Sequence, residues 1–413
     1  MRLILQYLKK YKGWFALNLI SVFGFALVEL GIPTIVAQMI DNGVLSGDEG
    51  YIWRMGAVIA VISVIGVLGT ILMGYCCARL SSSITADIRA SVFEKAQRFS
   101  HSEFNRFGIS SMITRTNNDA FQIQMFLNVL FRTALMTPVM LIASFAMTLR
   151  ASLDLSLIIA GTIPLIILGV VIVAKASKPI SERQQTAQDG MNRVSRENLS
   201  GIRVVRAFNN DAYEEERFGK ENESFTRSSK RMFKMMMMTA PIFFLVMNVA
   251  GVLIFWRGGQ LIGLGKIEIG QLTAFMDYLF HAMFSMMLFC TVFMMYPKAA
   301  VSAGRIKQVL ETEPLVQDPA DGMALDNVID TVRFEHVTFA YPGSDERVLE
   351  DIDFEARRGE TVAFIGSTGS GKSTLINLLP RFYDVTGGAV RINGADVRKL
   401  KLSSLRDAIG FIP

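Results

Sequence analysis

Eight consecutive residues, Gly366 to Ser373, carry the chemistry that is easiest to read from this sequence: Gly-Ser-Thr-Gly-Ser-Gly-Lys-Ser. They fit the pattern G-x-x-x-x-G-K-[ST] at every position. Such glycines let successive backbone N–H groups point inward onto phosphate oxygens, and the lysine adds a charge on the β- and γ-phosphates. Ser373 would place its hydroxyl on Mg²⁺, with Thr374 beside it. The candidate phosphate-binding residues are Gly366, Ser367, Thr368, Gly369, Ser370, Gly371, Lys372, Ser373 and Thr374.

The neighbouring residues place this segment at a turn between a strand and a helix. Thr361 to Ile365 is a short apolar run that predicts a buried strand, and Lys372 to Leu379 predicts the start of a helix. The N-terminus of that helix would add about half a positive charge toward a bound anion. The alternative is a glycine-rich turn that only ends a strand. The complete pattern favours nucleotide binding, with Lys372 as the charge-stabilising catalytic group.

The composition indicates a membrane protein. Hydrophobic residues make up 51% of the 413 residues, charged residues 19%, and the mean hydropathy is +0.36. The net charge of +5 does not indicate nucleic-acid binding, because the basic residues lie between apolar stretches. Cys76, Cys77 and Cys290 lie in apolar runs without metal or disulfide spacing. The N-terminal segment is too long for a signal peptide, so we expect a retained first span.

Six segments are long and apolar enough to cross about 30 Å of hydrocarbon. They lie near residues 14–40, 52–78, 129–149, 155–174, 235–256 and 271–296. Lys and Arg precede the first span and fill the two long loops, residues 79–115 and 175–234, whereas the short loops carry little charge. The protein is therefore expected in the cell membrane with its N-terminus, both long loops and the nucleotide-binding region in the cytoplasm.

The long loops show helical periodicity. Leu80, Ile84, Ile88 and Val92 recur every four residues, which predicts that the second span continues as a helix of about 48 residues, or roughly 70 Å. The fourth and fifth spans can continue in the same way, with Pro164 and Pro179 as expected kinks of the fourth. Two helical hairpins would then project beyond the membrane.

A proline- and acid-rich stretch after the sixth span marks a domain boundary. We expect a membrane domain over residues 1–312, a linker over 313–330, and the first part of an α/β P-loop domain over 331–413. Its expected strands are 331–339, 348–356, 361–365 and 388–392. A short helix and one last strand are expected within 402–412.

Together these features resemble an ATP-binding cassette (ABC) exporter half-transporter of the multidrug-resistance type, with its six-helix membrane fold. Phe107-Gly108, Thr114-Arg115 and Asp119 look like the first coupling region of that family. Residues 197–208 match its pattern E-x-x-x-G-x-x-V-V-x-x-F. The resemblance implies ATP and Mg²⁺ as cofactors and assigns Tyr341 to stacking on adenine; without it, Tyr341 would be a surface strand tyrosine.

The sequence departs from the family pattern at its C-terminal end. Residues 409–413 resemble the segment just before the Q-loop glutamine. The glutamine, the signature motif, the Walker B carboxylates and the switch histidine do not occur in the given residues. We therefore expect these residues to be a C-terminally truncated fragment that does not hydrolyse ATP alone, and the parent protein to work as a homo- or heterodimer of half-transporters.

Three ionisable residues, Glu29, Asp277 and His281, fall inside the expected spans. Glu29 and Asp277 lie at similar depth, and Asp277 and His281 are one helical turn apart on a shared face. One interpretation is a hydrogen-bonded structural cluster; the other is a cavity lining that favours cationic substrates. Methionines of the spans are expected in lipid or core contacts, although flexible thioethers would also suit a promiscuous cavity.

The leading hypothesis is ATP-driven export of a small amphipathic, drug-like, lipid or peptide substrate. The alternative is a nucleotide-gated channel or regulatory membrane protein of the same architecture, which an uphill flux assay distinguishes. An importer permease is disfavoured because spans and P-loop share one chain with the spans first. The expected partners are membrane lipid, a second half-transporter and the substrate, without nucleic acid.

Overall fold

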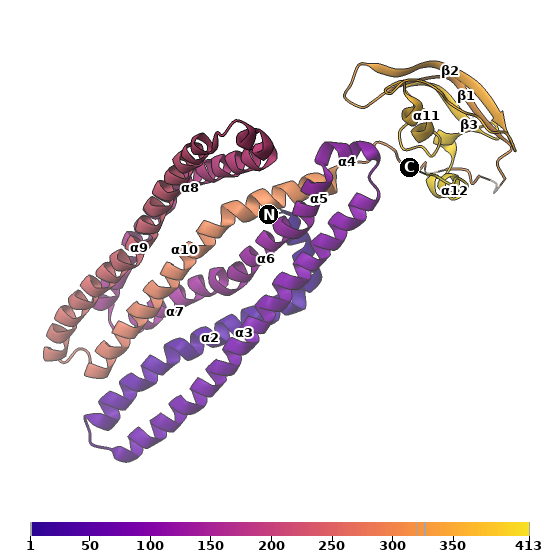
Figure 1. The fold of residues 1–413 in the computed structure, drawn as a ribbon. Coiled ribbons are helices and arrows are strands. Elements are labelled where there is room, and N and C mark those ends of the chain that lie inside the picture. The colour runs from indigo at the N-terminus through magenta and orange to yellow at the C-terminus, as the bar shows by residue number, and fades with distance from the viewer. Residues whose placement is uncertain (1, 320, 326–327, 413) are drawn as a thin grey trace. The chain divides into compact units, whose positions relative to one another are not determined.

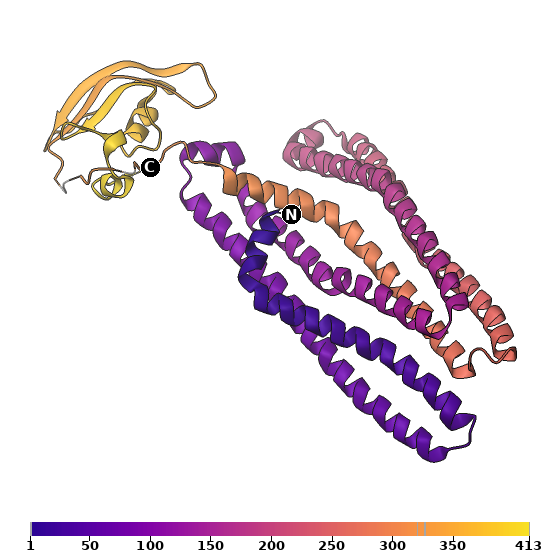
Figure 2. The ribbon, with the colours of Figure 1, turned by 180° about the vertical axis from the view of Figure 1, so that it is seen from behind.

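The computed structural model describes residues 2–319, 321–325 and 328–412 and divides the chain into two compact units. The first unit comprises residues 1–85 and 122–301, and the second comprises residues 86–121 and 302–413. The second unit thus combines the end of the second long helix, the first long loop and the end of the sixth long helix with the nucleotide-binding region. Figures 1 and 2 show the chain from opposite sides.

Within the described residues, six helical segments are long and apolar enough to cross a membrane, as the sequence predicts. The prolines expected to kink the fourth span, Pro164 and Pro179, lie inside one continuous helix. The α-helices are α1 (Arg2–Leu8), α2 (Lys12–Met39), α3 (Glu49–Gln97), α4 (His101–Phe107), α5 (Ile109–Thr114), α6 (Ala120–Val129), α7 (Leu135–Ala151), α8 (Leu153–Ala207), α9 (Asp211–Gly263) and α10 (Ile269–Glu311). Between them lie a 3-10 turn, η1 (Lys9–Tyr11), and the one-turn π segments η2 (Ile40–Val44), η3 (Arg115–Asp119) and η4 (Leu130–Ala134).

The predicted extension of the second span is confirmed, because α3 is one helix of 49 residues. The four apolar residues with helical spacing, Leu80, Ile84, Ile88 and Val92, are all 0% exposed. A single buried stripe therefore continues from the apolar part of α3 into its polar part, and packing along this stripe stabilises the helix beyond the span.

The fourth and fifth long helices form an antiparallel hairpin. Both views show α8 and α9 side by side (Figures 1 and 2), and Gln184 Nε2 donates to Ser229 Oγ across the pair at 3.0 Å. Together with α10 they enclose an apolar core whose fully buried members include Leu155, Ile254 and Phe275. A second core lies where Leu30 of α2 contacts α7 and α10.

The second unit contains a four-stranded antiparallel sheet in the order β2-β1-β3-β4. The elements are β1 (Thr331–Ala340), β2 (Arg347–Arg357), α11 (Lys372–Leu378), β3 (Gly387–Ile392), β4 (Ala395–Asp396), η5 (Val397–Lys399) and α12 (Leu402–Asp407). Val332 in the centre pairs with Ala356 on one side and Ile392 on the other. Phe334, Val337 and Phe339 of β1 point into the core beneath α11 and α12.

Two expected strands are wrong. Residues 361–365 and 409–412 have no regular secondary structure and pair with none of the described strands. A parallel strand is stable when neighbouring strands satisfy its backbone and cover both its faces. Here Ile365 is 97% exposed and Ile412 is 93% exposed, so the apolar runs have no such neighbours among the described residues.

Candidate functional site

The loop before α11 has the backbone that a phosphate-binding turn requires. Gly369 and Gly371 have φ of +88° and +84°, in the left-handed region that glycine adopts without strain. A Cβ at Gly371 would also lie 2.7 Å from Leu349 Cδ2 and 3.0 Å from the Val348 carbonyl oxygen. The loop therefore approaches β2 too closely for any side chain at that position, while residues 366–370 are exposed.

Lys372, the first residue of α11, folds back over this loop. Its Nζ donates to the carbonyl oxygens of Gly366 at 2.9 Å and Ser367 at 2.7 Å, and to Ser370 Oγ at 3.2 Å. Three acceptors thus hold one positive charge at the loop, and the neighbouring Ser373 is exposed. This set of an ammonium group, an exposed hydroxyl and an exposed glycine-rich backbone fits a nucleotide phosphate with its metal ion.

Tyr341 lies beside the same helix, one residue after β1. Its hydroxyl is 2.8 Å from Thr374 Oγ1, and Thr374 is only 6% exposed. The Tyr341 ring makes edge-to-face contacts with Phe339 at 5.0 Å and Tyr383 at 5.3 Å. The structure therefore brings Tyr341 and the phosphate-loop residues together, with the Thr374 hydroxyl engaged by Tyr341.

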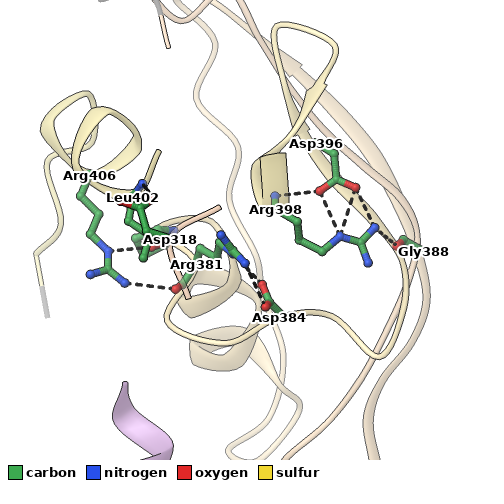
Figure 3. A network of polar contacts seen from close by, with 9 residues as sticks. Asp318, Arg381, Asp384, Gly388, Asp396, Arg398, Leu402 and Arg406 are labelled. Carbon is green, nitrogen blue, oxygen red and sulfur yellow. Dashed lines mark hydrogen bonds and ion pairs between the residues drawn. The ribbon is translucent and has the colours of Figure 1, made fainter. Parts of the chain in front are cut away.

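A network of charged side chains supports the turn that follows α11 (Figure 3). Arg381, 5% exposed and at φ +55°, binds Asp384 through Nε at 2.7 Å and through Nη2 at 3.2 Å. Arg406 of α12 donates to the carbonyl oxygens of Pro380 and Arg381, both at 3.2 Å. Burial and the nearby Arg381 charge lower the pKa of Arg406. The network fixes the C-terminal end of α11 against α12.

The polar residues of the membrane helices lie partly together. His281 Nδ1 of α10 is 3.6 Å from Glu29 Oε1 of α2, with side chains 20% and 35% exposed. One turn away on α10, Asp277 is exposed, while the adjacent Tyr278 shares a hydrogen bond of 2.6 Å with Thr34 of α2. A polar seam thus joins α2 and α10 at these positions.

Sequence reasoning missed the residues of α4 that contact the nucleotide-binding region. His101 stacks on Phe382 with ring centroids 4.7 Å apart, and Asn105 hydrogen-bonds the Tyr383 hydroxyl. The pKa of Tyr383 is raised, mainly by burial. One readable signal was Ser100-His101-Ser102-Glu103, because S-x-x-E marks the N-terminus of a helix.

Six membrane helices joined to a glycine-rich phosphate loop define a multi-pass membrane protein of the nucleotide-dependent transporter class. Two family models match the chain: the ABC transporter transmembrane region over residues 15–292, and the ABC transporter domain over residues 349–413. The chain belongs to the ABC transporter family, as an exporter half-transporter with an ATP-binding domain.

Relatives support this assignment. The chain is 35% identical over its whole length to an uncharacterised ABC transporter ATP-binding protein of Mycobacterium tuberculosis, of which it covers 71%. It is 27% identical to an ATP-dependent lipid A-core flippase of Syntrophus aciditrophicus, over 81% of this chain and 55% of the flippase. It is 30% identical to a fatty acid ABC transporter ATP-binding/permease protein of Mycobacterium bovis, over 79% of this chain and 51% of that protein.

Proposed function

We propose that this chain is one half of a dimeric exporter that uses ATP to move a lipid-like amphipathic substrate across the cell membrane. The observation that carries the proposal is the position of Lys372, whose ammonium group three loop oxygens hold at the N-terminal end of α11. We retain the division into a membrane domain, residues 1–312, a linker, residues 313–330, and a nucleotide-binding region from residue 331.

The residues that would hold ATP follow from this geometry. Backbone N–H groups of residues 366–371 would donate to the phosphates, Lys372 would move its hydrogen bonds from loop oxygens to phosphate oxygens, and Tyr341 would stack on adenine. Hydrolysis of bound ATP supplies the free energy for transport. In the described part of the chain, no cluster of three or more His, Cys, Asp or Glu could hold a metal ion. Among the residues of the loop and of α11, Ser373 would bind Mg²⁺ together with phosphate oxygens.

The substrate class rests on the membrane helices. Phenylalanine and methionine side chains line a small cleft between α9 and α10: Phe243, Phe244, Met247, Phe280, Met283, Phe284 and Met287. Phe280 lies beside His281, whose partner is Glu29. Adaptable apolar side chains next to a polar pair suit a molecule with an apolar chain and a polar head. The relatives named for lipid A-core and fatty acids act on molecules of this kind.

The test uses the assembled transporter in vesicles. Lys372→Ala removes the ammonium group that would neutralise charge on the phosphates. We therefore expect ATP-driven uphill flux to fall about 100-fold or more while membrane insertion is unchanged. Lys399→Ala, which removes an exposed lysine of η5, is the matched control and should leave flux intact. Flux that only runs downhill and is merely gated by ATP would identify a channel instead.

A further inference from the structure

The carboxylate of Glu103 is buried at the start of α4 and uses both of its oxygens. Glu103 is 3% exposed, and its Oε2 accepts the Ser100 N–H at 2.7 Å and the Ser100 hydroxyl at 2.6 Å. The Ser100 hydroxyl in turn accepts the Ser102 N–H at 3.3 Å. This capping box needs only one oxygen of residue 103, and glutamine can provide it as well as glutamate.

The second oxygen reaches a distant part of the chain. Glu103 Oε1 accepts the backbone N–H of Leu315 at 3.1 Å, across 212 positions of sequence. Leu315 lies in the segment between α10 and β1, four residues after α10 ends, and its own side chain is 61% exposed. The next residue, Val316, is 7% exposed. An exposed residue outside regular structure thus has its amide held by a buried carboxylate.

The C-terminal end of α10 contacts η3, which follows α4 and α5 in the chain. Asp119 of η3, 6% exposed, accepts the Ser302 hydroxyl at 2.9 Å and lies 3.3 Å from Arg305 Nε. Arg115 Nη1 donates to the Arg305 carbonyl oxygen at 2.5 Å. Residues 302–316 are therefore attached at two places to residues 100–119, while α4 also contacts Phe382 after the P-loop helix.

From these contacts we propose that Glu103 is a positioning residue that clamps the segment after α10 onto α4. With the clamp closed, a displacement of the nucleotide-binding region reaches α10 through α4 as well as through the continuous chain. With the clamp open, the segment around Leu315 can stretch or bend, and less of the displacement reaches α10. This last step rests on the proposed transport function; the clamp itself does not.

Hydrogen exchange of the whole chain in lipid nanodiscs tests the clamp directly. In the unaltered chain the Leu315 amide should exchange at least about tenfold more slowly than an unprotected amide. Glu103→Gln keeps an acceptor for the capping box but its amide group cannot serve both partners, so exchange at Leu315 should rise about tenfold while residues 101–107 stay protected. An unprotected Leu315 amide in the unaltered chain overturns the proposal without any variant. Unchanged exchange in Glu103→Gln, or loss of protection throughout α4, overturns it too.

A matched variant separates the clamp from charge effects on the same segment. Glu313→Gln removes the negative charge of a side chain that is 74% exposed and whose Oε1 lies 3.6 Å from Lys95 Nζ, and it should change exchange at Leu315 less than about twofold. In the assembled transporter, Glu103→Gln should lower the number of substrate molecules moved per ATP hydrolysed, whereas Glu313→Gln should not. An unchanged ratio, with exchange at Leu315 raised, overturns the transmission step. Absence of transport in the unaltered protein instead contradicts the proposed function, and the exchange result still decides the clamp.

Discussion

The hydroxyl of Tyr341 lies 2.8 Å from Thr374 Oγ1, so a hydrogen bond joins the residue that follows β1 to the third residue of α11. The bond holds an aromatic ring beside the phosphate loop at a fixed distance. Contacts with Phe339 and Tyr383 restrict the ring further. A base that stacks on this ring would thus be aligned with phosphates on the loop.

Two substitutions of Tyr341 distinguish the contribution of its ring to ATP binding from that of its hydroxyl. Tyr341→Ala removes the stacking surface and should weaken ATP binding by about 1 to 3 kcal/mol, which is the usual worth of one base stacked on an aromatic ring. Tyr341→Phe keeps the ring and should change affinity less than about threefold. Calorimetric titration with ATP measures both. Equal losses in the two variants would assign the effect to the bond with Thr374 instead of to stacking.

The topology prediction concerns the sides on which the loops lie. The excess of Lys and Arg in residues 79–115 and 175–234 places positions 98 and 217 in the cytoplasm and position 48 outside. Single cysteines at these positions, in a chain without Cys76, Cys77 and Cys290, should react with an impermeant thiol reagent from outside intact cells only at position 48. Labelling at 98 or 217 with position 48 protected would reverse the topology.

Glu29 provides the test of charge selectivity in the membrane helices. Its carboxylate is 3.6 Å from His281, and Glu29→Gln removes the charge while keeping the shape. If the seam between α2 and α10 lines a cavity that favours cations, export of a cationic substrate should fall more than export of a neutral one. Glu49→Gln, at the exposed start of α3, is the control. An equal loss for both substrates supports the structural interpretation of the cluster.

Gly388 and Gly394 form a matched pair for the stability of the sheet. Both have positive φ, +73° and +79°, so alanine costs about 1 to 2 kcal/mol at either position. At Gly394 a Cβ meets nothing within 4 Å, but at Gly388 it would lie 2.3 Å from the carbonyl oxygens of Glu335 and His336. Gly388→Ala should therefore lower the unfolding free energy by about 3 kcal/mol or more, with thermal unfolding as the measurement. Similar midpoints for the two variants would show that the backbone at Gly388 relaxes.

His336 makes the stability of the sheet depend on pH. A hydrogen bond of 2.7 Å to Asp351, the Asp351 charge and the Asp353 charge raise the pKa of His336. The pKa of His336 is thus higher in the folded state than the unfolded value of about 6.5. Protonated His336 therefore stabilises the folded state fully below about pH 6.5, and this stabilisation is lost as pH rises through the folded-state pKa.

Asp351→Asn should therefore lower the His336 pKa and reduce stability at about pH 5.5 more than at about pH 9. Asp351 has φ of +53°, which asparagine also tolerates, so the variant adds little strain. With three histidines in the sequence, histidine NMR signals can be assigned with His336→Gln. An unchanged His336 titration in Asp351→Asn would contradict the prediction.

The helices could be predicted because their signal is local. Leu80, Ile84, Ile88 and Val92 repeat at the helical period, and the 49-residue helix follows from that pattern. The strand expected at 361–365 could not be judged in this way, because a run of apolar residues does not say whether another strand lies beside it. At that place the exposure of Ile365 contradicts the pattern.

The candidate site likewise has features that one sequence can predict and contacts that it cannot. The candidate phosphate loop could be proposed from spacing alone, because phosphate binding by such a loop depends on consecutive backbone N–H groups. The bond of Tyr341 to Thr374 and the bond of Glu103 to Leu315 join residues 33 and 212 positions apart. Such pairs depend on how the elements pack, and one sequence has no periodicity that records them.

Because α3 is long, a small tilt of this helix moves its end by a large distance. At 1.5 Å per residue its 49 residues extend about 73 Å, so a tilt of about 5° at one end displaces the other end by about 6 Å. The apolar side chains of Leu80, Ile84, Ile88 and Val92 along its polar part are fully buried. Because α3 is one continuous helix, a small tilt of its axis would produce a movement of several ångströms at its end.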